Sequence, residues 1–315
     1  MLRATKPFTL LLVPIGLLLT ACALSPVATL TATLVPTATA TLTATLTATP
    51  TATATPTTTP TTTPTATPTP RPVTPMLPAG TERVIGGAPM VFVPAGEFLM
   101  GSSDADSDAD YTEKPQHKVY LDAFWIDKFE VTNALYKRCV DAGGCSAPQA
   151  IRPYIRYPYY GNSQYDNYPV LTDLWNDAAV FCEWAKKQLP TEAQWEKAAL
   201  GTDGRIYPWG NSFNKHMLNS SEGGRGDIAA VGSYPLGASP CGAMDMAGNV
   251  MEWVADWYNS NYYRNSPSRN PTGPSSGSYR VLRGGMWWGI AACVRTAARG
   301  TETAKWCSIG FRCVQ

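Results

Sequence analysis

Hydrophobic residues alternate with small or polar residues in two stretches near the start of the folded part of the chain. Residues 89–102, PMVFVPAGEFLMGS, combine this alternation with turn glycines and predict a β-hairpin. Residues 117–132, HKVYLDAFWIDKFEVT, continue the strand-like pattern. We therefore expect this part of the chain to be mainly β-structure.

Helical periodicity replaces this alternation in three later segments. Thr132 is expected to cap a helix over residues 133–143, and a second helix is predicted over residues 175–188. A third begins at the capping box formed by Thr191 and Gln194 in LPTEAQWEKAAL. The residues expected to face the core are Leu135, Tyr136, Cys139, Ala178, Phe181, Cys182, Ala185, Trp195, Ala198 and Ala199.

Regular patterns become scarce after Gly201, where turn residues recur every few positions. The chain is rich in glycine, proline, tryptophan and tyrosine, a composition that favours loops over a helix bundle. A domain that is mostly loop needs disulfides, buried aromatic side chains or ions for its stability. We therefore expect residues 80–315 to form an irregular, loop-rich α+β domain.

The first 22 residues, MLRATKPFTLLLVPIGLLLTAC, have the features of an export signal. Two early cations precede an apolar run from Phe8 to Leu19, which is too short for a comfortable membrane span. An ordinary secretory signal peptide is one interpretation. The ending LLTAC resembles the lipobox of bacterial lipoproteins, so we predict that residues 1–22 are a lipoprotein signal and that Cys22 is lipidated. The chain would then be exported and anchored to the outer face of the cell membrane.

Residues 23–78 consist almost entirely of threonine, alanine and proline and cannot bury a core. They are predicted to be a disordered linker that favours extended polyproline II structure, reaching on the order of 150 Å at about 3.1 Å per residue. The formal net charge is +1, and no basic stripe stands out. This argues against nucleic acid as a partner, because phosphate binding requires clustered lysines and arginines.

Seven cysteines follow Cys22, and an exported chain meets oxidising conditions that favour disulfides. Because seven is odd, at least one cysteine is expected to stay unpaired within the chain. Cys139 and Cys145 are close in sequence with a Gly-Gly turn between them, which predicts a local disulfide.

Seven segments occur in an order that resembles the formylglycine-generating enzyme (sulfatase-modifying factor) family. They are PAGEFLMGS, FEVTNALY, LPTEAQWEKAA, YPWGN, GAMDMAGNVMEWVADWY, VLRGGMWW and IGFRC, and the resemblance spans residues 83–315. It implies a compact, irregular α+β fold related to C-type lectins. It also implies a disulfide between Cys182 and Cys313, which would close a loop of about 130 residues.

The resemblance further implies that the segment DMAGNVMEW binds calcium. The ligands carried over are the side chain of Asp245, the carbonyl oxygens of Gly248 and Val250, and the carboxylate of Glu252. Hard oxygen donors of this kind suit Ca²⁺. The alternative is that Glu252 only pairs with an arginine such as Arg283.

A second calcium site is implied in which an asparagine acts together with a downstream acidic residue. Asn219 matches the asparagine, and we favour Asp227 over Glu222 as its partner. The two histidines, His117 and His216, share no metal-ligand spacing with other residues.

The family's enzymes oxidise a sulfatase cysteine to formylglycine, using oxygen and Cu(I) held by two thiolates. Thiolates suit Cu(I) because it is a soft cation. The first thiolate position falls on or near Gly289 in this chain, and Cys293 lies near the second only if a gap is allowed. Met286 also replaces the usual serine after Gly-Gly. Cys293 is thus the one catalytic candidate, and a single thiolate cannot form the copper site.

A structural role is the better supported interpretation of Cys293. Pairing it with Cys307 is the simplest arrangement and leaves Cys241 free, although the sequence leaves the pairing of these three cysteines open. The alternative is a divergent oxidase in which Cys293 is a working thiolate, so the sequence leaves open whether the chain is an enzyme.

The remaining candidates are arginines and tryptophans of the matching segments. The arginines Arg295, Arg299 and Arg312 are expected to pair with buried carboxylates and carbonyls. The tryptophans Trp253, Trp257, Trp287 and Trp288 either join the core or line a groove with arginines for a peptide, protein or glycan. We therefore expect a surface-anchored, calcium-stabilised binding or scaffold module, with the divergent formylglycine-generating oxidase as the alternative.

Overall fold

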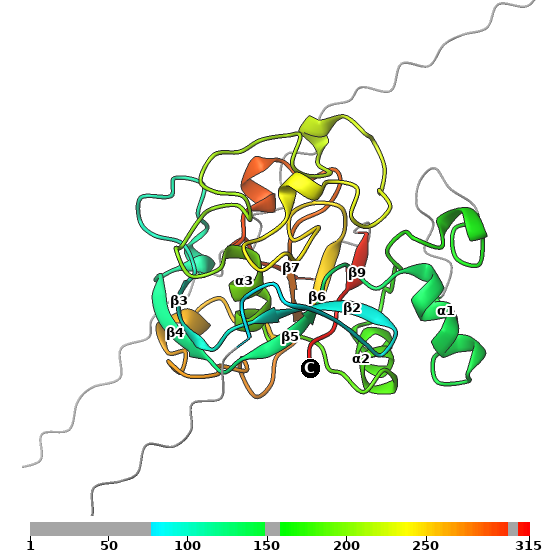
Figure 1. The fold of residues 1–315 in the computed structure, drawn as a ribbon. Coiled ribbons are helices and arrows are strands. Elements are labelled where there is room, and N and C mark those ends of the chain that lie inside the picture. The colour runs from blue at the N-terminus through cyan, green and yellow to red at the C-terminus, as the bar shows by residue number, and fades with distance from the viewer. Residues whose placement is uncertain (1–76, 149–157, 302–307) are drawn as a thin grey trace, which may run out of the picture. The chain divides into compact units, whose positions relative to one another are not determined.

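The computed structural model describes residues 77–148, 158–301 and 308–315. Within these ranges, three short α-helices and three small sheets are joined by long loops (Figure 1). Single 3-10 turns interrupt the loops at Tyr111–Glu113, Ser163–Tyr165, Ser221–Gly223, Pro235–Gly237, Tyr262–Arg264 and Ala291–Val294. This mixed, loop-rich architecture is the one expected. The predicted signal peptide, nearly all of the predicted linker, and Cys22 and Cys307 lie outside the described residues.

Two antiparallel sheets form from the first part of the domain. The first has the order β1 (Glu82–Ile85), β2 (Ala88–Val93) and β5 (Phe124–Asp127), and the second pairs β3 (Gly96–Met100) with β4 (His117–Leu121). The prediction of a hairpin over residues 89–102 is wrong, because β2 and β3 are strands of different sheets. Alternation reports which face of a strand is buried, but it carries no information on which strand lies beside it.

The third sheet carries three of the seven family segments. Its order is β8 (Gly300–Thr301), β7 (Arg280–Arg283), β6 (Met251–Trp257) and β9 (Ile309–Phe311). Strands β6 and β9 run parallel, and the other pairs are antiparallel. The central strand β6 thus joins segments that lie far apart in sequence.

The three predicted helices are present as α1 (Asn133–Asp141), α2 (Trp175–Trp184) and α3 (Glu192–Leu200). The predicted caps are also present, since Thr132 accepts from the third backbone N–H of α1 and α3 begins with a complete capping box. Helix α2 ends four residues early, at a turn in which Lys186 has a φ of 59°. Of the predicted core residues only Leu135 is not fully buried.

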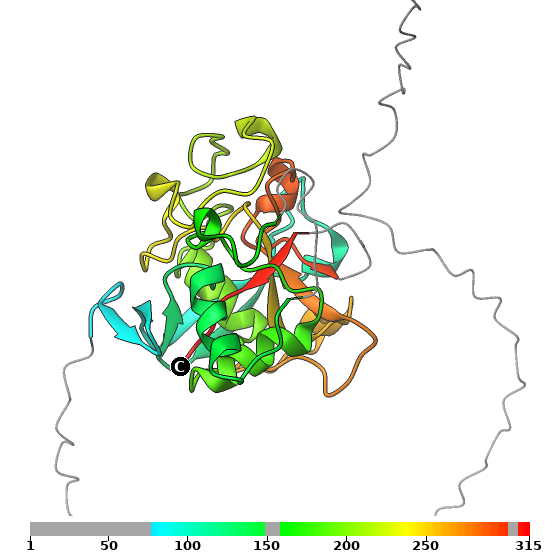
Figure 2. The same cartoon turned by 90° about the vertical axis from the view of Figure 1, so that its right-hand side faces the viewer.

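Helices α1 and α2 pack against each other at one side of the third sheet, as the two views show (Figures 1 and 2). Helix α3 packs against β3, β4, β6 and β7, which places it between the second and third sheets. Within the described ranges, each helix falls short of the length and hydrophobicity that a bilayer span requires.

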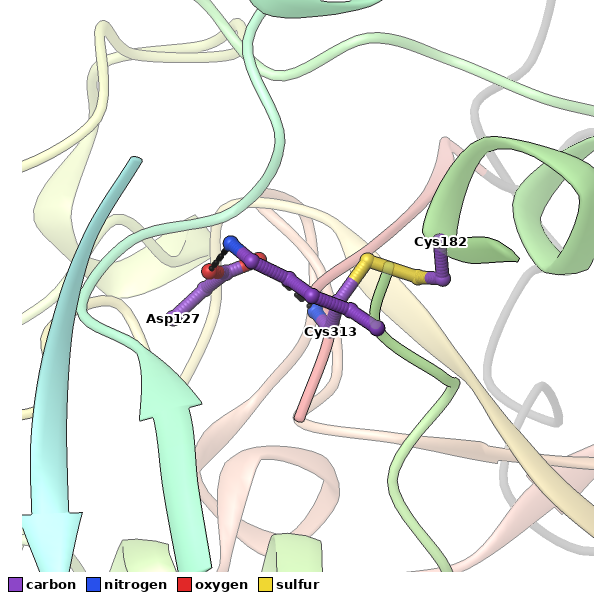
Figure 3. Close-up of a disulfide and its surroundings, with 4 residues drawn as sticks. Asp127, Cys182 and Cys313 are labelled. Carbon is purple, nitrogen blue, oxygen red and sulfur yellow. Dashed lines mark hydrogen bonds and ion pairs between the residues drawn. A yellow bond between two sulfur atoms is a disulfide. The ribbon is translucent and has the colours of Figure 1, made fainter. Parts of the chain in front are cut away.

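Two predicted disulfides are present between described residues. Cys139 and Cys145 are joined at the end of α1, and Cys182 of α2 is joined to Cys313 beside the C-terminus (Figure 3). Asp127 accepts the backbone N–H of Cys313 at 2.9 Å and an N–H of Lys187 at 2.6 Å. A buried ion pair therefore braces the long-range disulfide.

Candidate functional site

The segment that follows β7 is where the family's thiolates would lie. Gly284 and Gly285 have φ values of 88° and 72°, and a Cβ atom at Gly285 would lie 2.6 Å from the carbonyl oxygen of Cys293. The double glycine is therefore required because the chain folds back tightly onto the Cys293 turn. At the first thiolate position, the carbonyl of Gly289 accepts hydrogen bonds from the N–H and the hydroxyl of Ser221.

The sulfur chemistry of this segment does not fit a two-thiolate copper site. Cys293 is disulfide-bonded, and its predicted partner Cys307 lies outside the described residues. In the part of the chain that is described, the one free cysteine is Cys241, which is 5% exposed and donates to the carbonyl of Ala198. Burial raises the pKa of the Cys241 thiol, which keeps it protonated and unreactive.

The arginines of this region are structural, as predicted. Arg295 makes a two-pronged pair with Glu113 at 2.7 and 2.8 Å, and Arg299 makes one with Glu192 at 2.6 and 2.9 Å. The guanidinium groups of both arginines are nearly inaccessible to solvent. They hold loops to α3 and to the Tyr111–Glu113 turn and are not available to an external ligand.

Glu252 also pairs with an arginine, but the partner is Arg312. Arg312 donates to both carboxylate oxygens at 2.6 and 2.7 Å, and Trp195 donates to one of them at 2.9 Å. Arg283, which lies opposite Glu252 in the sheet register, pairs with Glu196 of α3. Strand register therefore does not identify the charge partner here, because each of these two side chains pairs with a charge from outside the β6–β7 pair, Glu252 with Arg312 and Arg283 with Glu196.

The tryptophans divide between the core and a partly exposed surface. Trp253 is 1% exposed and donates to a backbone carbonyl, so it belongs to the core. Trp257 and Trp175 enclose the guanidinium of Arg280, with ring centres 3.5 and 3.7 Å from its central carbon. This sandwich was not predicted, because its three members come from separate parts of the chain. Trp287 and Trp288 are partly buried.

The loop before β6, which carries the predicted calcium ligands, has an unusual backbone. Asp245, Gly248 and Asn249 all have left-handed backbone angles, with φ values of 58°, 77° and 62°. The loop carries the carbonyls of Gly248 and Val250 and leads directly to Glu252.

Carboxylates outnumber cations in this buried region. Glu130 is 1% exposed and accepts the side-chain N–H groups of Asn249 with both oxygens, at 3.0 and 3.1 Å. Burial, followed by repulsion from Asp245 and Glu252, raises the pKa of Glu130 well above its usual range. Burial likewise raises the pKa of Asp245 to about 6. These three carboxylates, called the acidic cluster below, thus lie within electrostatic reach of the Arg312 guanidinium, which pairs directly with Glu252 alone, and a bound cation would relieve the imbalance.

Asn219 provides a second indication of a cation. It is 2% exposed, and its side-chain nitrogen donates to the carbonyl of Asp227 at 2.9 Å, so the structure brings these two predicted residues together. Its side-chain oxygen is buried without a hydrogen-bond partner. An unpaired buried amide oxygen is costly, and it is a ligand that Ca²⁺ accepts.

No three His, Cys, Asp or Glu side chains converge as a metal cluster within the described ranges. A calcium ion here would therefore depend on carbonyl and amide oxygens as much as on carboxylates. The donor set fits calcium in kind: Asp245, Glu252 and two carbonyls in one site, and Asn219 with Asp227 in the other.

An open hollow of about 760 Å³ is lined by residues 209–216 and by Glu222. Trp209 and Phe213 supply its apolar lining, and Trp209 stacks on Tyr207 with ring centres 5.3 Å apart. Glu222 lies at its edge and accepts the backbone N–H of Ala291 at 3.0 Å. This hollow was not predicted, although the YPWGN segment that forms it carried part of the resemblance.

Comparison with known proteins resolves the family. The profile of the sulfatase-modifying factor enzyme 1-like domain matches residues 78–315. The formylglycine-generating enzyme of Streptomyces coelicolor is 34% identical over 291 residues, which cover 75% of this chain and 91% of that enzyme. The chain belongs to the sulfatase-modifying factor family.

Other members of this family differ in size. Serine/threonine-protein kinase pkn1 of Chlamydia caviae is 35% identical over 241 residues, which cover 72% of this chain and only 38% of that protein. PvdO from Pseudomonas aeruginosa has a similar structure, with a TM-score of 0.63 and 25% identity over 76% of this chain and 99% of PvdO. The fold assignment therefore rests on sequence and structure together.

Proposed function

We propose that this member of the sulfatase-modifying factor family is a calcium-stabilised binding module that does not carry out copper-dependent cysteine oxidation. The observation that carries the proposal is the state of the thiol segment: Cys293 is disulfide-bonded, and Gly289 stands at the other thiolate position. Cu(I) held by two thiolates cannot form from these residues. The competing candidate, a divergent formylglycine-generating oxidase, is favoured by the 34% identity to the Streptomyces coelicolor enzyme.

A turnover assay separates the two candidates. The chain without its first 22 residues is loaded with Cu(I) and given oxygen and a peptide bearing the Cys-x-Pro-x-Arg motif, and mass spectrometry follows the formylglycine product. We expect no conversion above a metal-free control, with the Streptomyces coelicolor enzyme as positive control. Conversion that disappears in the Cys293→Ser variant would establish the oxidase and refute the binding module.

The hollow lined by Trp209 and Phe213 is the proposed ligand site. The side-chain oxygens of Asn211 and Asn214 accept backbone N–H groups, so their NH₂ groups are the parts left for a ligand. Lys215 lines the same hollow. An aromatic face beside amide and ammonium donors suits a ligand with an apolar ring face and many acceptor oxygens, and we favour a glycan over a peptide or a protein surface.

Calorimetric titration with a panel of neutral and acidic oligosaccharides tests this placement. Binding is expected to weaken at least tenfold in Trp209→Ala, because a ring-stacking surface is lost. Tyr279→Ala removes a 45% exposed aromatic elsewhere and serves as the matched control. Equal losses in both variants, or binding by neither parent nor variant, would exclude the hollow as a glycan site.

The predicted lipid anchor would give the binding module its location. We expect the chain to be held at the outer face of the bacterial membrane through Cys22. Cell fractionation tests this directly: the Cys22→Ser variant is expected to move from the membrane fraction to the soluble exported fraction. An unchanged distribution would rule out the lipid at Cys22.

A further inference from the structure

Asn249 lies between the two proposed calcium sites and is hydrogen-bonded toward both of them. It is 1% exposed, it has a φ of 62°, and every polar group of the residue is engaged. The inference drawn from it rests on the calcium part of the proposed function and concerns how the two sites communicate.

Toward the Asn219–Asp227 site, Asn249 fixes the orientation of Asn219. Its side-chain oxygen accepts the Asn219 side-chain N–H at 3.1 Å, and its backbone N–H donates to the Asn219 carbonyl at 2.9 Å. Because the Asn219 nitrogen is held by Asn249 and by the carbonyl of Asp227, the Asn219 amide oxygen must face the other way. That oxygen is the buried atom without a partner.

Toward the Asp245–Glu252 site, Asn249 separates the two residues whose carbonyls are the proposed ligands, Gly248 and Val250. Its side-chain nitrogen donates to both oxygens of Glu130, which feels the charges of Asp245 and Glu252. A displacement of Asn249 would therefore act both on the carbonyl-bearing backbone and on Glu130 of the acidic cluster.

The backbone of the two sites is also in direct contact. Asn219 and Gly248 form an isolated parallel bridge, and a Cβ atom at Gly248 would overlap the Asn219 carbonyl. A displacement of one loop cannot be absorbed locally, because close-packed atoms transmit strain to their neighbours.

We infer that Asn249 is a positioning residue that couples the two calcium sites, so that an ion in either site raises the affinity of the other. An ion on the Asn219 oxygen would fix the position of Asn219. Asn219 would then fix Asn249 through their hydrogen bonds, and Asn249 would fix the carbonyls of its neighbours Gly248 and Val250. The first ion then bears the loss of conformational entropy of these loops, and the second ion binds loops that are already ordered. The coupling is reciprocal, and a factor of about ten is typical of such linkage.

The experiment is calcium calorimetry on the chelator-treated chain without its first 22 residues. The single-site variants Asp227→Asn and Asp245→Ala give the intrinsic affinity of each remaining site. Dividing the product of the two binding constants of the parent chain by the product of these intrinsic constants gives the coupling factor. We expect a factor of about ten in the parent chain and close to one in Asn249→Gly, which keeps the left-handed backbone accessible.

Two further variants keep the inference falsifiable. Asn249→Asp keeps an acceptor oxygen and tolerates positive φ but replaces the donor to Glu130 with a carboxylate that repels it, so it is expected to lower the coupling factor even if Asn249→Gly does not fold. Asn270→Gly replaces an exposed asparagine with a φ of 44° and is expected to leave the factor unchanged.

The possible outcomes distinguish the coupling through Asn249 from the calcium-stabilised module on which it rests. Two ions bound with a coupling factor of one in the parent chain overturn the inference and leave the calcium-stabilised module standing. A coupling factor of ten that survives in both Asn249 variants also overturns it. An absence of calcium uptake by the parent chain removes the calcium sites themselves, which is a different and recognisable result.

Discussion

Asp256 illustrates how burial sets the properties of a single residue in this domain. Its side chain is 2% exposed and accepts the backbone N–H of Glu192 at 2.8 Å. Burial, followed by the negative charge of Glu192, raises the pKa of Asp256 to about 7. Since the folded pKa lies above the unfolded value, the folded state holds a proton that the unfolded chain releases above about pH 4.

The pH dependence of stability follows from this sign. The contribution of Asp256 is fully present below about pH 4 and is lost as the pH rises through 7, so the free energy of unfolding should fall by about 2 kcal/mol between pH 5.5 and 8. Asp256→Asn keeps the acceptor oxygen and removes the proton equilibrium, so the slope should flatten. Urea titrations across this range, in saturating calcium, measure it. An unaltered slope in the variant would show that other groups set the pH dependence.

At the scale of elements, the start of α3 combines local and long-range constraints. Thr191 and Gln194 satisfy each other's backbone N–H groups, while Glu192 in the first turn pairs with Arg299. The helix therefore starts at a position fixed by its own sequence, and its first turn then anchors the loop that carries Arg299.

Loss of this cap should have a measurable and limited effect. Thr191→Ala is expected to lower the free energy of unfolding by about 1 kcal/mol, because one backbone N–H of the first turn loses its acceptor. Lys137→Ala on α1 is the control, since its pair with Asp141 is half exposed and contributes little. Equal destabilisation by the two substitutions would contradict the role assigned to the cap.

At the scale of the whole molecule, disulfides and ions compensate for the shortage of regular structure. The Cys182–Cys313 disulfide joins residues 131 positions apart, whereas Cys139–Cys145 joins residues six apart. Loop-closure entropy then predicts stabilisation of about 5 kcal/mol for the first and about 2 kcal/mol for the second. Paired alanine variants compared by chemical denaturation should reproduce that order, and the reverse order would show that native-state packing outweighs chain entropy.

Bound calcium should also stabilise the domain as a whole. When the free calcium concentration is about one hundred times the dissociation constant, each bound ion adds roughly 2.7 kcal/mol to the free energy of unfolding. For a domain of this size, removing two such ions is expected to lower the melting temperature by about 10–20 °C. Differential scanning calorimetry with and without chelator, and with magnesium as the control ion, measures the change. A melting temperature that chelation leaves unchanged would remove calcium as a stabiliser of the fold.

The sequence by itself determined the features whose causes are local. The starts of α1 and α3 follow from Thr132 and Thr191, because a cap acts within one turn of its own helix. The Cys139–Cys145 disulfide follows from a short separation with a glycine turn. Ordered motifs identified the family, and with it Asp245, Glu252 and Asn219 as candidate ligands.

Only the tertiary structure decided the pairings between distant segments. β2 lies beside β5 and not beside β3, Glu252 pairs with Arg312 and not with Arg283, and Glu130 joins the acidic cluster. The physical reason is shared by all three cases. Each partner is chosen by how buried charge and backbone groups are satisfied when the whole chain packs, and that choice depends on distances in space which no local pattern of residues encodes.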